Sequence, residues 1–235
     1  MKALGLIGGT SWHSTIEYYR NINQAVNKHF GNNTNPPLLL FNQNQALIHR
    51  LQRENNWQAI AELFVEAGQK LERAGATALL FCANTPHKIY EAVVPHISIP
   101  ILHIVDATAK AILQAGLSKV CFIGTRFSME EAFLSQRFVQ CGVELIMPAD
   151  AANITELHRI IQQELTFGNV RPSSKQFVIQ CIEAMLDAGA QGVVLGCTEF
   201  PLMIAPEDVP VPMFNTTELH SHAACAYILS EHTQA

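Results

Sequence analysis

Short runs of apolar residues alternate with longer segments of helical period along the whole chain. This alternation is typical of parallel βαβ units, so the sequence predicts an α/β fold. The apolar runs predict eight strands, at Lys2–Gly8, Leu38–Phe41, Thr77–Phe81, Ile99–His103, Lys119–Ile123, Val143–Met147, Gly192–Leu195 and Val211–Phe214.

The segments between the strands carry signals for helix starts and helix ends. A Ser or Asn three residues ahead of a Glu predicts a capping box, and the pattern occurs at Ser14, Ser128, Asn153 and Asn215. A Gly just before the next strand predicts a helix end with left-handed backbone, and such residues are Gly75, Gly116, Gly142 and Gly189.

The two halves of the chain repeat each other at a constant spacing. Thr10 and Thr125 both follow an apolar run and a Gly, and they are 115 residues apart. Cys82 and Cys197 are separated by the same 115 residues. Any parallel sheet repeats strand, Gly and helix, so chance is the alternative explanation. We expect two similar domains of about four strands each, at 1–104 and 105–214, with a final helix at 215–235 packing back on the first.

Composition narrows the class of protein. The 235 residues are 49% hydrophobic and 15% charged, which excludes a disordered chain. A net charge of -5 disfavours nucleic acid as a partner. The apolar run at the N-terminus ends at Gly8, and no run reaches the length of a membrane span, so we expect no export signal and no membrane contact. The six cysteines form no Cys-x-x-Cys pair and the ten histidines are scattered, which predicts free thiols, a cytoplasmic location and no metal.

Two of the cysteines occupy places where ligands collect in an open parallel sheet. Cys82 and Cys197 each follow a predicted strand, at the carboxyl end where loops lead into helices. Backbone N–H groups and a helix start at such a place predict a lowered thiol pKa. The alternative is that each is a small core residue. His87 and Lys88 either add positive charge beside Cys82 or are solvated surface residues. The remaining cysteines are predicted to be buried packing residues: Cys121, Cys141, Cys181 and Cys225.

Two thiols that face one bound molecule from opposite sides have a specific chemical use. Inverting a stereocentre beside a carboxylate requires one base to remove the Cα proton and one acid to deliver a proton to the other face. Hydrogen-bond donors must stabilise the growing charge on the carboxylate. The neighbouring residues offer such donors, at Thr10, Ser11, Asn84, Thr85, Thr125 and Thr198, and the design needs no cofactor.

Longer motifs now carry a resemblance to a known family. They are Gly8-Gly9-Thr10-Ser11-Trp12, Cys82-Ala83-Asn84-Thr85-Pro86-His87-Lys88, Gly124-Thr125-Arg126-Phe127-Ser128-Met129 and Gly196-Cys197-Thr198-Glu199. The chain resembles the aspartate/glutamate racemase family over nearly its whole length. The resemblance implies two α/β domains related by pseudo-twofold symmetry, assembly into a homodimer, and a two-thiol mechanism without a cofactor.

The resemblance also implies roles for single residues. Cys82 and Cys197 fall where the family has its acid/base pair, and five positions fall where it contacts substrate: Thr10, Gln52, Asn84, Thr85 and Thr198. Ala83, Thr125 and Glu199 complete the predicted substrate-binding set, and Glu199 is expected to orient Cys197, to accept from its thiol or to cap a helix.

The chain departs from that family at positions that are expected to affect substrate specificity. Gln43-Asn44-Gln45 stands where Val-Asp-Phe is usual, and Ala83 stands where Thr is common. The predicted loop 43–52 offers Arg50 as the cation for a side-chain carboxylate, although Arg50 can instead lie on the outer face of a helix beginning near Gln45. We expect an amino-acid racemase for aspartate, glutamate or a related polar amino acid. The alternatives are a maleate-isomerase-like or decarboxylating enzyme and a two-lobed amino-acid-binding protein.

Overall fold

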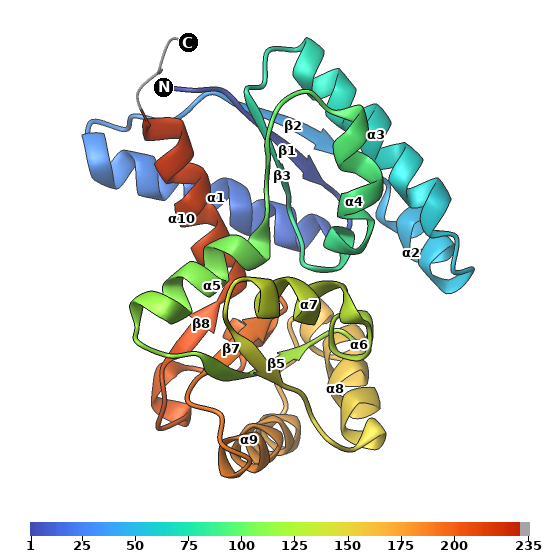
Figure 1. The fold of residues 1–235 in the computed structure, drawn as a ribbon, viewed down its shortest axis with the longest axis vertical. Helices are drawn as coiled ribbons and strands as arrows, with labels where there is room; N and C mark the ends of the chain where they lie inside the picture. The colour runs from blue at the N-terminus through green and yellow to red at the C-terminus, as the bar shows by residue number, and fades with distance from the viewer. Residues whose placement is uncertain (231–235) are drawn as a thin grey trace. The chain divides into compact units, whose positions relative to one another are not determined.

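The computed structural model of the protein describes residues 1–230, and the chain divides into two compact units (Figure 1). The first unit contains Met1–Ile104 and takes up the chain again from His220, whereas the second unit is the continuous stretch Val105–Leu219. The last five positions of the predicted helix 215–235 lie outside the described residues.

The first unit is built on a four-stranded parallel sheet in the order β2-β1-β3-β4. Its strands are β1 (Leu4–Gly8), β2 (Leu38–Asn42), β3 (Ala78–Phe81) and β4 (Ile101–Leu102). The two inner strands β1 and β3 are buried along their whole length, which explains why they read as continuous apolar runs. The edge strand β2 is only half-buried.

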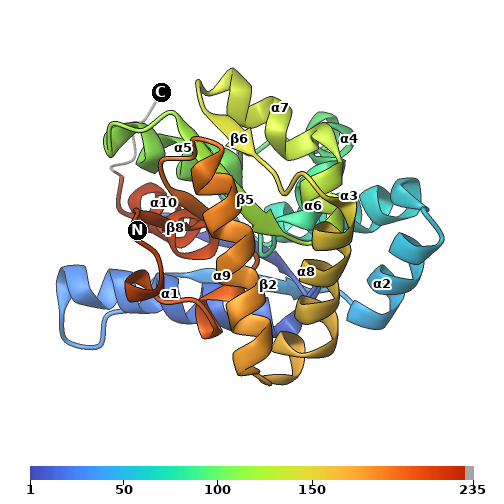
Figure 2. The same ribbon diagram turned by 90° about the horizontal axis from the view of Figure 1, so that it is seen from below.

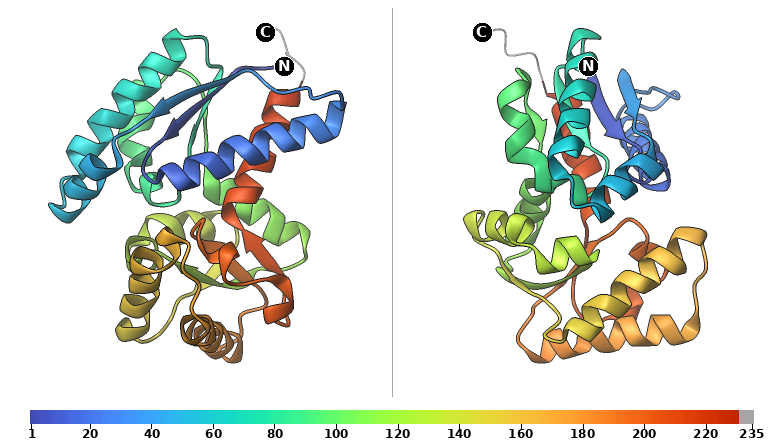
Figure 3. Two further views of the ribbon diagram at one scale, coloured as in Figure 1. Left: turned by 180° about the vertical axis from the view of Figure 1, so that it is seen from behind. Right: turned by 90° about the vertical axis from the view of Figure 1, so that its right-hand side faces the viewer.

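Helices cover both faces of this sheet (Figures 1 and 3). One face packs against α2 (Gln45–Arg53), α3 (Trp57–Arg73) and the short helix α4 (Tyr90–Val93), which continues into η2 (Val94–His96). The other face packs against α1 (Trp12–Phe30) and α10 (Thr216–Leu229). Because side chains alternate along a strand, Ala78 and Leu80 of β3 face α1 and α10, while Leu79 and Phe81 face α3.

The second unit repeats the same topology, with a parallel sheet in the order β6-β5-β7-β8. Its strands are β5 (Lys119–Gly124), β6 (Glu144–Ile146), β7 (Val193–Gly196) and β8 (Met213–Asn215). Its helices include α5 (Ile104–Gln114), α6 (Arg126–Glu130), α7 (Ala132–Gln140), α8 (Ala151–Gln163) and α9 (Pro172–Asp187). Helices α8 and α9 lie side by side (Figure 2). The matching strand orders confirm that the constant spacing in the sequence reflects two similar sheets.

The predicted strands are all present, with differences at their ends. The prediction Ile99–His103 shortens to the two residues of β4, and Lys2–Gly8 begins at Leu4. The helix ends at Gly75, Gly116, Gly142 and Gly189 are confirmed, because each of these residues has a positive φ. Within residues 1–230, every helix is too short or too polar to cross a bilayer.

Three of the four predicted helix starts are wrong by one turn. The side chain of Asn215 does accept from the backbone N–H groups of Thr217 and Glu218 at the start of α10. The other three helices have their N-caps three residues before the predicted caps Ser14, Ser128 and Asn153, at Ser11, Thr125 and Asp150. In the patterns at Ser14 and Asn153, the Glu forms an ion pair with an Arg one turn later instead of binding the N-cap. These pairs are Glu17–Arg20 and Glu156–Arg159.

Candidate active site

The first predicted thiol, Cys82, directly follows β3 and is held by backbone contacts. Its N–H donates to the carbonyl of Ile7 at 3.0 Å, and its carbonyl accepts from Ser14 Oγ at 2.6 Å. The residue is 2% exposed, and it belongs to the apolar cluster beneath α1 and α10. Neighbouring strand β1 and helix α1 therefore determine where the thiol lies.

Polar residues gather around the same strand ends. Thr10, Asn84 and Thr85 are buried, and Ala83 is half-buried. Thr10 Oγ1 is inaccessible to solvent and has no hydrogen-bond partner among the described residues. A buried hydroxyl without a partner is costly, so Thr10 Oγ1 is an unsatisfied polar atom beside these strand ends.

The Gly-rich segment after β1 is a turn that brings β2 close. Gly9 has φ +85°, and a Cβ atom there would lie 2.1 Å from the carbonyl oxygen of Gln43. The N–H of Gln43 donates to the carbonyl of Gly8, and its side chain donates to the carbonyl of Leu63. Gln43 is therefore a buried structural residue, and only Gly satisfies the backbone at position 9.

The predicted loop 43–52 is wrong, because residues 45–53 form the helix α2. Asn44 caps it by accepting from the N–H of Leu47, a signal that the sequence analysis overlooked. The alternative placement of Arg50 holds: its side chain is 60% exposed and lies 3.9 Å from Glu54. Gln52 is half-buried.

Helix α2 is joined to the turn after β1 through His49, whose Nε2 lies 3.1 Å from the carbonyl oxygen of Thr10. Residues three and four positions later share that face of a helix, so Gln52 and Arg53 lie on the side of Thr10. Burial lowers the pKa of His49, the hydrogen bond to Thr10 opposes this shift, and the positive charge of Arg53 adds a smaller lowering. Arg53 is not among the predicted site residues, and its side chain is exposed.

The second predicted thiol, Cys197, directly follows β7 and has a side-chain partner. Its Sγ donates to Glu199 Oε2 at 2.9 Å, and Thr198 Oγ1 donates to the same oxygen at 2.7 Å. Cys197 and Glu199 are 8% and 7% exposed. The contact confirms that Glu199 accepts from the thiol.

Thr125 ends the matching strand β5 and is half-buried. Its Oγ1 lies 3.1 Å from Ser128 Oγ, and its carbonyl accepts from the same hydroxyl at 2.7 Å. Ser128 therefore orients Thr125 at the start of α6 instead of capping a helix of its own.

The prediction of lowered thiol pKa values is wrong. Burial raises the pKa of Cys82 far above its ordinary range. Burial also raises the pKa of Cys197, and the charge and the hydrogen bond of Glu199 raise it further. The backbone N–H groups of Thr198 and Glu199 act in the expected direction, lowering the pKa of Cys197, but desolvation is the larger effect. Both thiols are therefore protonated at rest.

Both interpretations of His87 are also wrong. Its ring is 3% exposed, and burial, with His103 and His220 nearby, keeps its pKa well below the ordinary value. It is a buried neutral residue that supplies no positive charge to Cys82. The ammonium of Lys88 lies 3.8 Å from the centre of the Trp57 ring, a cation–π contact.

All six cysteines are free thiols, as predicted. Cys121, Cys181 and Cys225 are buried packing residues. Cys141 departs from the prediction, because it ends helix α7, is only half-buried, and places its Sγ 3.9 Å from Asp106 Oδ1. In the described part of the chain, no three His, Cys, Asp or Glu side chains gather where they could hold a metal ion.

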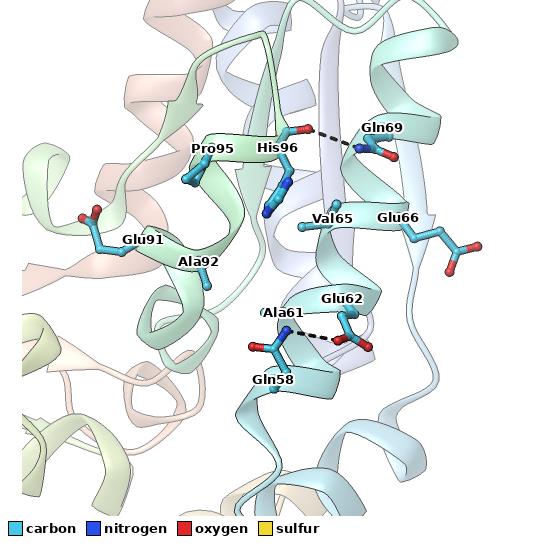
Figure 4. A pocket seen from close by; sticks show the side chains of 10 residues that line it. All are labelled: Gln58, Ala61, Glu62, Val65, Glu66, Gln69, Glu91, Ala92, Pro95 and His96. Carbon is cyan, nitrogen blue, oxygen red and sulfur yellow. Dashed lines mark hydrogen bonds between the residues drawn. The ribbon is translucent and has the colours of Figure 1, made fainter.

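A pocket of about 630 Å³ lies between α3 and the segment α4–η2 (Figure 4). None of the predicted site residues lines it. Its lining includes the acids Glu62, Glu66 and Glu91, besides Gln58, Ala61, Val65, Gln69, Ala92, Pro95 and His96. Three carboxylates repel an anionic ligand, so this pocket does not suit an acidic amino acid.

These features define an α/β protein of two similar units, each ending one central strand in a buried thiol. The chain belongs to the Asp/Glu/Hydantoin racemase family, whose sequence profile matches residues 7–224. This membership and the two-sheet fold support an isomerase of the racemase type.

Solved structures agree with this assignment. The chain is 39% identical to a candidate Asp/Glu racemase from Yersinia pestis, with a TM-score of 0.93 over 98% of this chain and 100% of the other. It is 34% identical to an aspartate racemase homologue from Pyrococcus horikoshii OT3, with a TM-score of 0.87 and the same coverage, 98% and 100%. The aspartate racemase of Picrophilus torridus shares the fold, with 16% identity and a TM-score of 0.75 over 97% and 94% of the two chains.

Proposed function

We propose that the protein racemises a polar amino acid, without a cofactor, by using Cys82 and Cys197 as its acid/base pair. The observation that carries the proposal is the equivalence of the two thiols. Cys82 directly follows β3, and Cys197 directly follows β7. Each of these strands is the third of its sheet in chain order and pairs with the first, which is β1 or β5. Two copies of one unit thus supply one thiol each, as a reaction with two proton transfers on opposite faces requires.

The proton balance starts from two neutral thiols. Cys197 gives its proton to Glu199, which already accepts a hydrogen bond from it at 2.9 Å. The thiolate removes the Cα proton from one face of the substrate, and the neutral Cys82 donates its proton to the other face. Cys82 is then the thiolate and Cys197 the thiol, and the reverse reaction runs from that state.

Burial has two effects on this chemistry. It makes each thiolate costly, but it also excludes water, which strengthens every hydrogen bond to the growing negative charge. The backbone N–H groups of Thr198 and Glu199 favour the thiolate of Cys197. The substrate carboxylate is assigned to Thr10, whose hydroxyl has no partner among the described residues, together with Asn84, Thr85, Thr125 and Thr198.

The substrate class rests on the names of the relatives, which are racemases or racemase homologues for aspartate and glutamate. A side-chain carboxylate prefers a cation as its partner. Helix α2 offers two cations, Arg50 and Arg53. Both are exposed, and Arg53 lies on the face of His49. Aspartate and glutamate are therefore the first candidates, followed by asparagine, glutamine and serine.

The test is hydrogen exchange at Cα in deuterated water, combined with circular dichroism of the amino acid. Racemisation exchanges the Cα proton and inverts the product without loss of substrate, whereas a decarboxylase or a maleate isomerase changes the carbon skeleton or its bonds. A binding protein does neither.

Single substitutions then test the thiols. Cys82→Ser and Cys197→Ser should each lower turnover by at least about 10²-fold, because a hydroxyl is a far weaker acid and base at neutral pH. Cys141→Ser is the matched control, since it changes a half-buried thiol at the end of α7. Turnover above a tenth of the wild-type value in either thiol variant contradicts the two-base assignment.

A further inference from the structure

Three buried histidines lie beneath the turn that follows Cys82, and the proposed proton transfers do not use them. This histidine cluster consists of His87, His103 and His220, which are 3%, 5% and 0% exposed. The ring of His87 lies 4.4 Å from that of His103 and 5.7 Å from that of His220, measured between ring centres. Polar rings are rarely buried together without a specific hydrogen-bonding role.

The hydrogen bonds of His87 define its tautomer. Its Nδ1 lies 3.0 Å from the carbonyl oxygen of Ala83 and 3.2 Å from that of Asn84, so Nδ1 must carry a hydrogen and donate. Its Nε2 lies 3.2 Å from the backbone N–H of Ile104, so Nε2 must accept. A second proton would set two N–H groups against each other. His87 is therefore the neutral Nδ1–H form.

These contacts connect two particular places in the chain. Ala83 and Asn84 are the residues immediately after Cys82. Ile104 is the residue at which the chain leaves the first unit. His220, at which the chain returns to the first unit, donates through Nε2 to the carbonyl of Leu102 at 2.9 Å, and its Nδ1 accepts from Tyr18 Oη at 3.0 Å.

The turn after Cys82 lacks the usual side-chain cap of a helix start. The short helix η1 (Thr85–Ile89) begins there, its N-cap Asn84 makes no capping hydrogen bond with its side chain, and Pro86 has no backbone N–H. The ring of His87 reaches back instead and binds the two carbonyls that precede the helix.

We propose that His87 is a positioning residue for Cys82, because its Nδ1–H holds the Ala83–Asn84 turn. The contact of Nε2 with the N–H of Ile104 fixes the tautomer that leaves the Nδ1–H free to donate. The proposal rests on the proposed function for its kinetic consequence, because misplacing a catalytic group by about 1 Å costs about 10²-fold in rate. His87 does not touch the substrate in this account and acts through the backbone beside the thiol.

Two amide substitutions separate the two contacts. In His87→Asn the side-chain amide takes the place of Nδ1 and keeps a donor for Ala83, but loses the acceptor for Ile104. In His87→Gln the amide takes the place of Nε2 and keeps that acceptor, but loses the donor to Ala83. Tyr227→Phe is the control for the loss of one hydrogen bond to a backbone carbonyl in the same unit, since Tyr227 Oη donates to Thr77.

We expect His87→Gln to lower kcat by at least about tenfold with a smaller change in KM, and His87→Asn to stay within about threefold of wild type. Alkylation of Cys82 by iodoacetamide, measured by peptide mass spectrometry without substrate, should be at least tenfold faster in His87→Gln. Labelling of Cys197, which belongs to the other unit, is the internal reference and should not change.

Equal losses in the Asn and Gln variants, or unchanged Cys82 labelling in His87→Gln, overturn the proposal. The labelling result does not depend on turnover, so a wild-type protein that exchanges no Cα proton refutes the proposed function and leaves this test intact. Nitrogen-15 NMR of the wild-type ring covers the case in which a variant does not fold: an Nδ1–H tautomer supports the assignment, and an Nε2–H tautomer overturns it.

Discussion

Replacing Glu199 by Gln separates two effects of this residue on Cys197. The carboxylate accepts the thiol hydrogen at 2.9 Å and is buried with it. As the proposed proton acceptor, it makes turnover possible. As a negative charge beside the sulfur, it opposes the thiolate, which is one reason why the pKa of Cys197 is raised. Glu199→Gln removes the acceptor and the charge at once, with little change in volume.

The size of the electrostatic effect follows from the distance. Two negative charges about 4 Å apart repel by about 4 kcal/mol at an effective dielectric constant of about 20. A quarter of that energy still changes the thiolate population about fivefold, since about 1.4 kcal/mol corresponds to a factor of ten. Loss of a positioned proton acceptor costs about 10²- to 10⁴-fold in rate.

The two readouts should therefore move in opposite directions. The pKa of Cys197 falls in Glu199→Gln, so its alkylation at pH 8 becomes at least about fivefold faster and its pH profile moves to lower pH. Turnover falls by at least about 10²-fold. Cys82 labelling should not move, because burial alone raises the pKa of that thiol. Glu207→Gln, at an exposed position of the same unit, controls for loss of one negative charge.

Retained turnover, within about threefold of wild type, would refute the role of Glu199 as proton acceptor. Slower labelling of Cys197 would refute the reasoning at an earlier step, because it would mean that the carboxylate stabilises the thiolate.

Three further outcomes are expected. Thr10→Val should raise the free energy of unfolding in urea by about 1 kcal/mol, because it removes a buried hydroxyl that has no partner among the described residues, and should raise KM for the amino acid; an unchanged KM removes Thr10 from the site. Arg53→Ala should lower kcat/KM for aspartate more than for asparagine, whereas Arg50→Ala, which loses an exposed pair with Glu54, should change both by less than about twofold. Dialysis against a chelator should leave turnover unchanged, since two thiols supply both proton transfers; lost activity that zinc restores would contradict that mechanism.

The strands and their duplication could be predicted, because strands that are buried on both faces of a parallel sheet consist of continuous runs of apolar residues. The two halves also keep one spacing, so Cys82 and Cys197 were found as a pair from the sequence alone. Helix starts failed by one turn where a Ser or Asn inside the first turn preceded a Glu, since this pattern is the same whether the residue is the cap or three positions beyond it.

The ionisation of the thiols could not be predicted in the same way. The sequence places Cys82 at a strand end, and the two-residue alternation puts it on the face of Ala78 and Leu80. It does not say that α10, which comes more than a hundred residues later, covers that face. Burial raises the pKa of Cys82, and this distant helix contributes to the apolar cluster in which the thiol is buried. The role of His87 was missed for a related reason, because its partner Ile104 is distant in the sequence.

The discontinuity of the first unit has a consequence for biosynthesis. Val105–Leu219 is one continuous stretch, so every residue of the second sheet and its covering helices has been made before Ala224, Cys225 and Ile228 exist. Those three side chains complete the apolar layer over β1 and β3, and the carbonyl of Ile228 accepts from the N–H of Lys2. During synthesis the usual order, in which the N-terminal domain matures first, is therefore reversed. The strands of the first unit are made first, but one face of their sheet stays partly uncovered until the ribosome has made the second unit and α10.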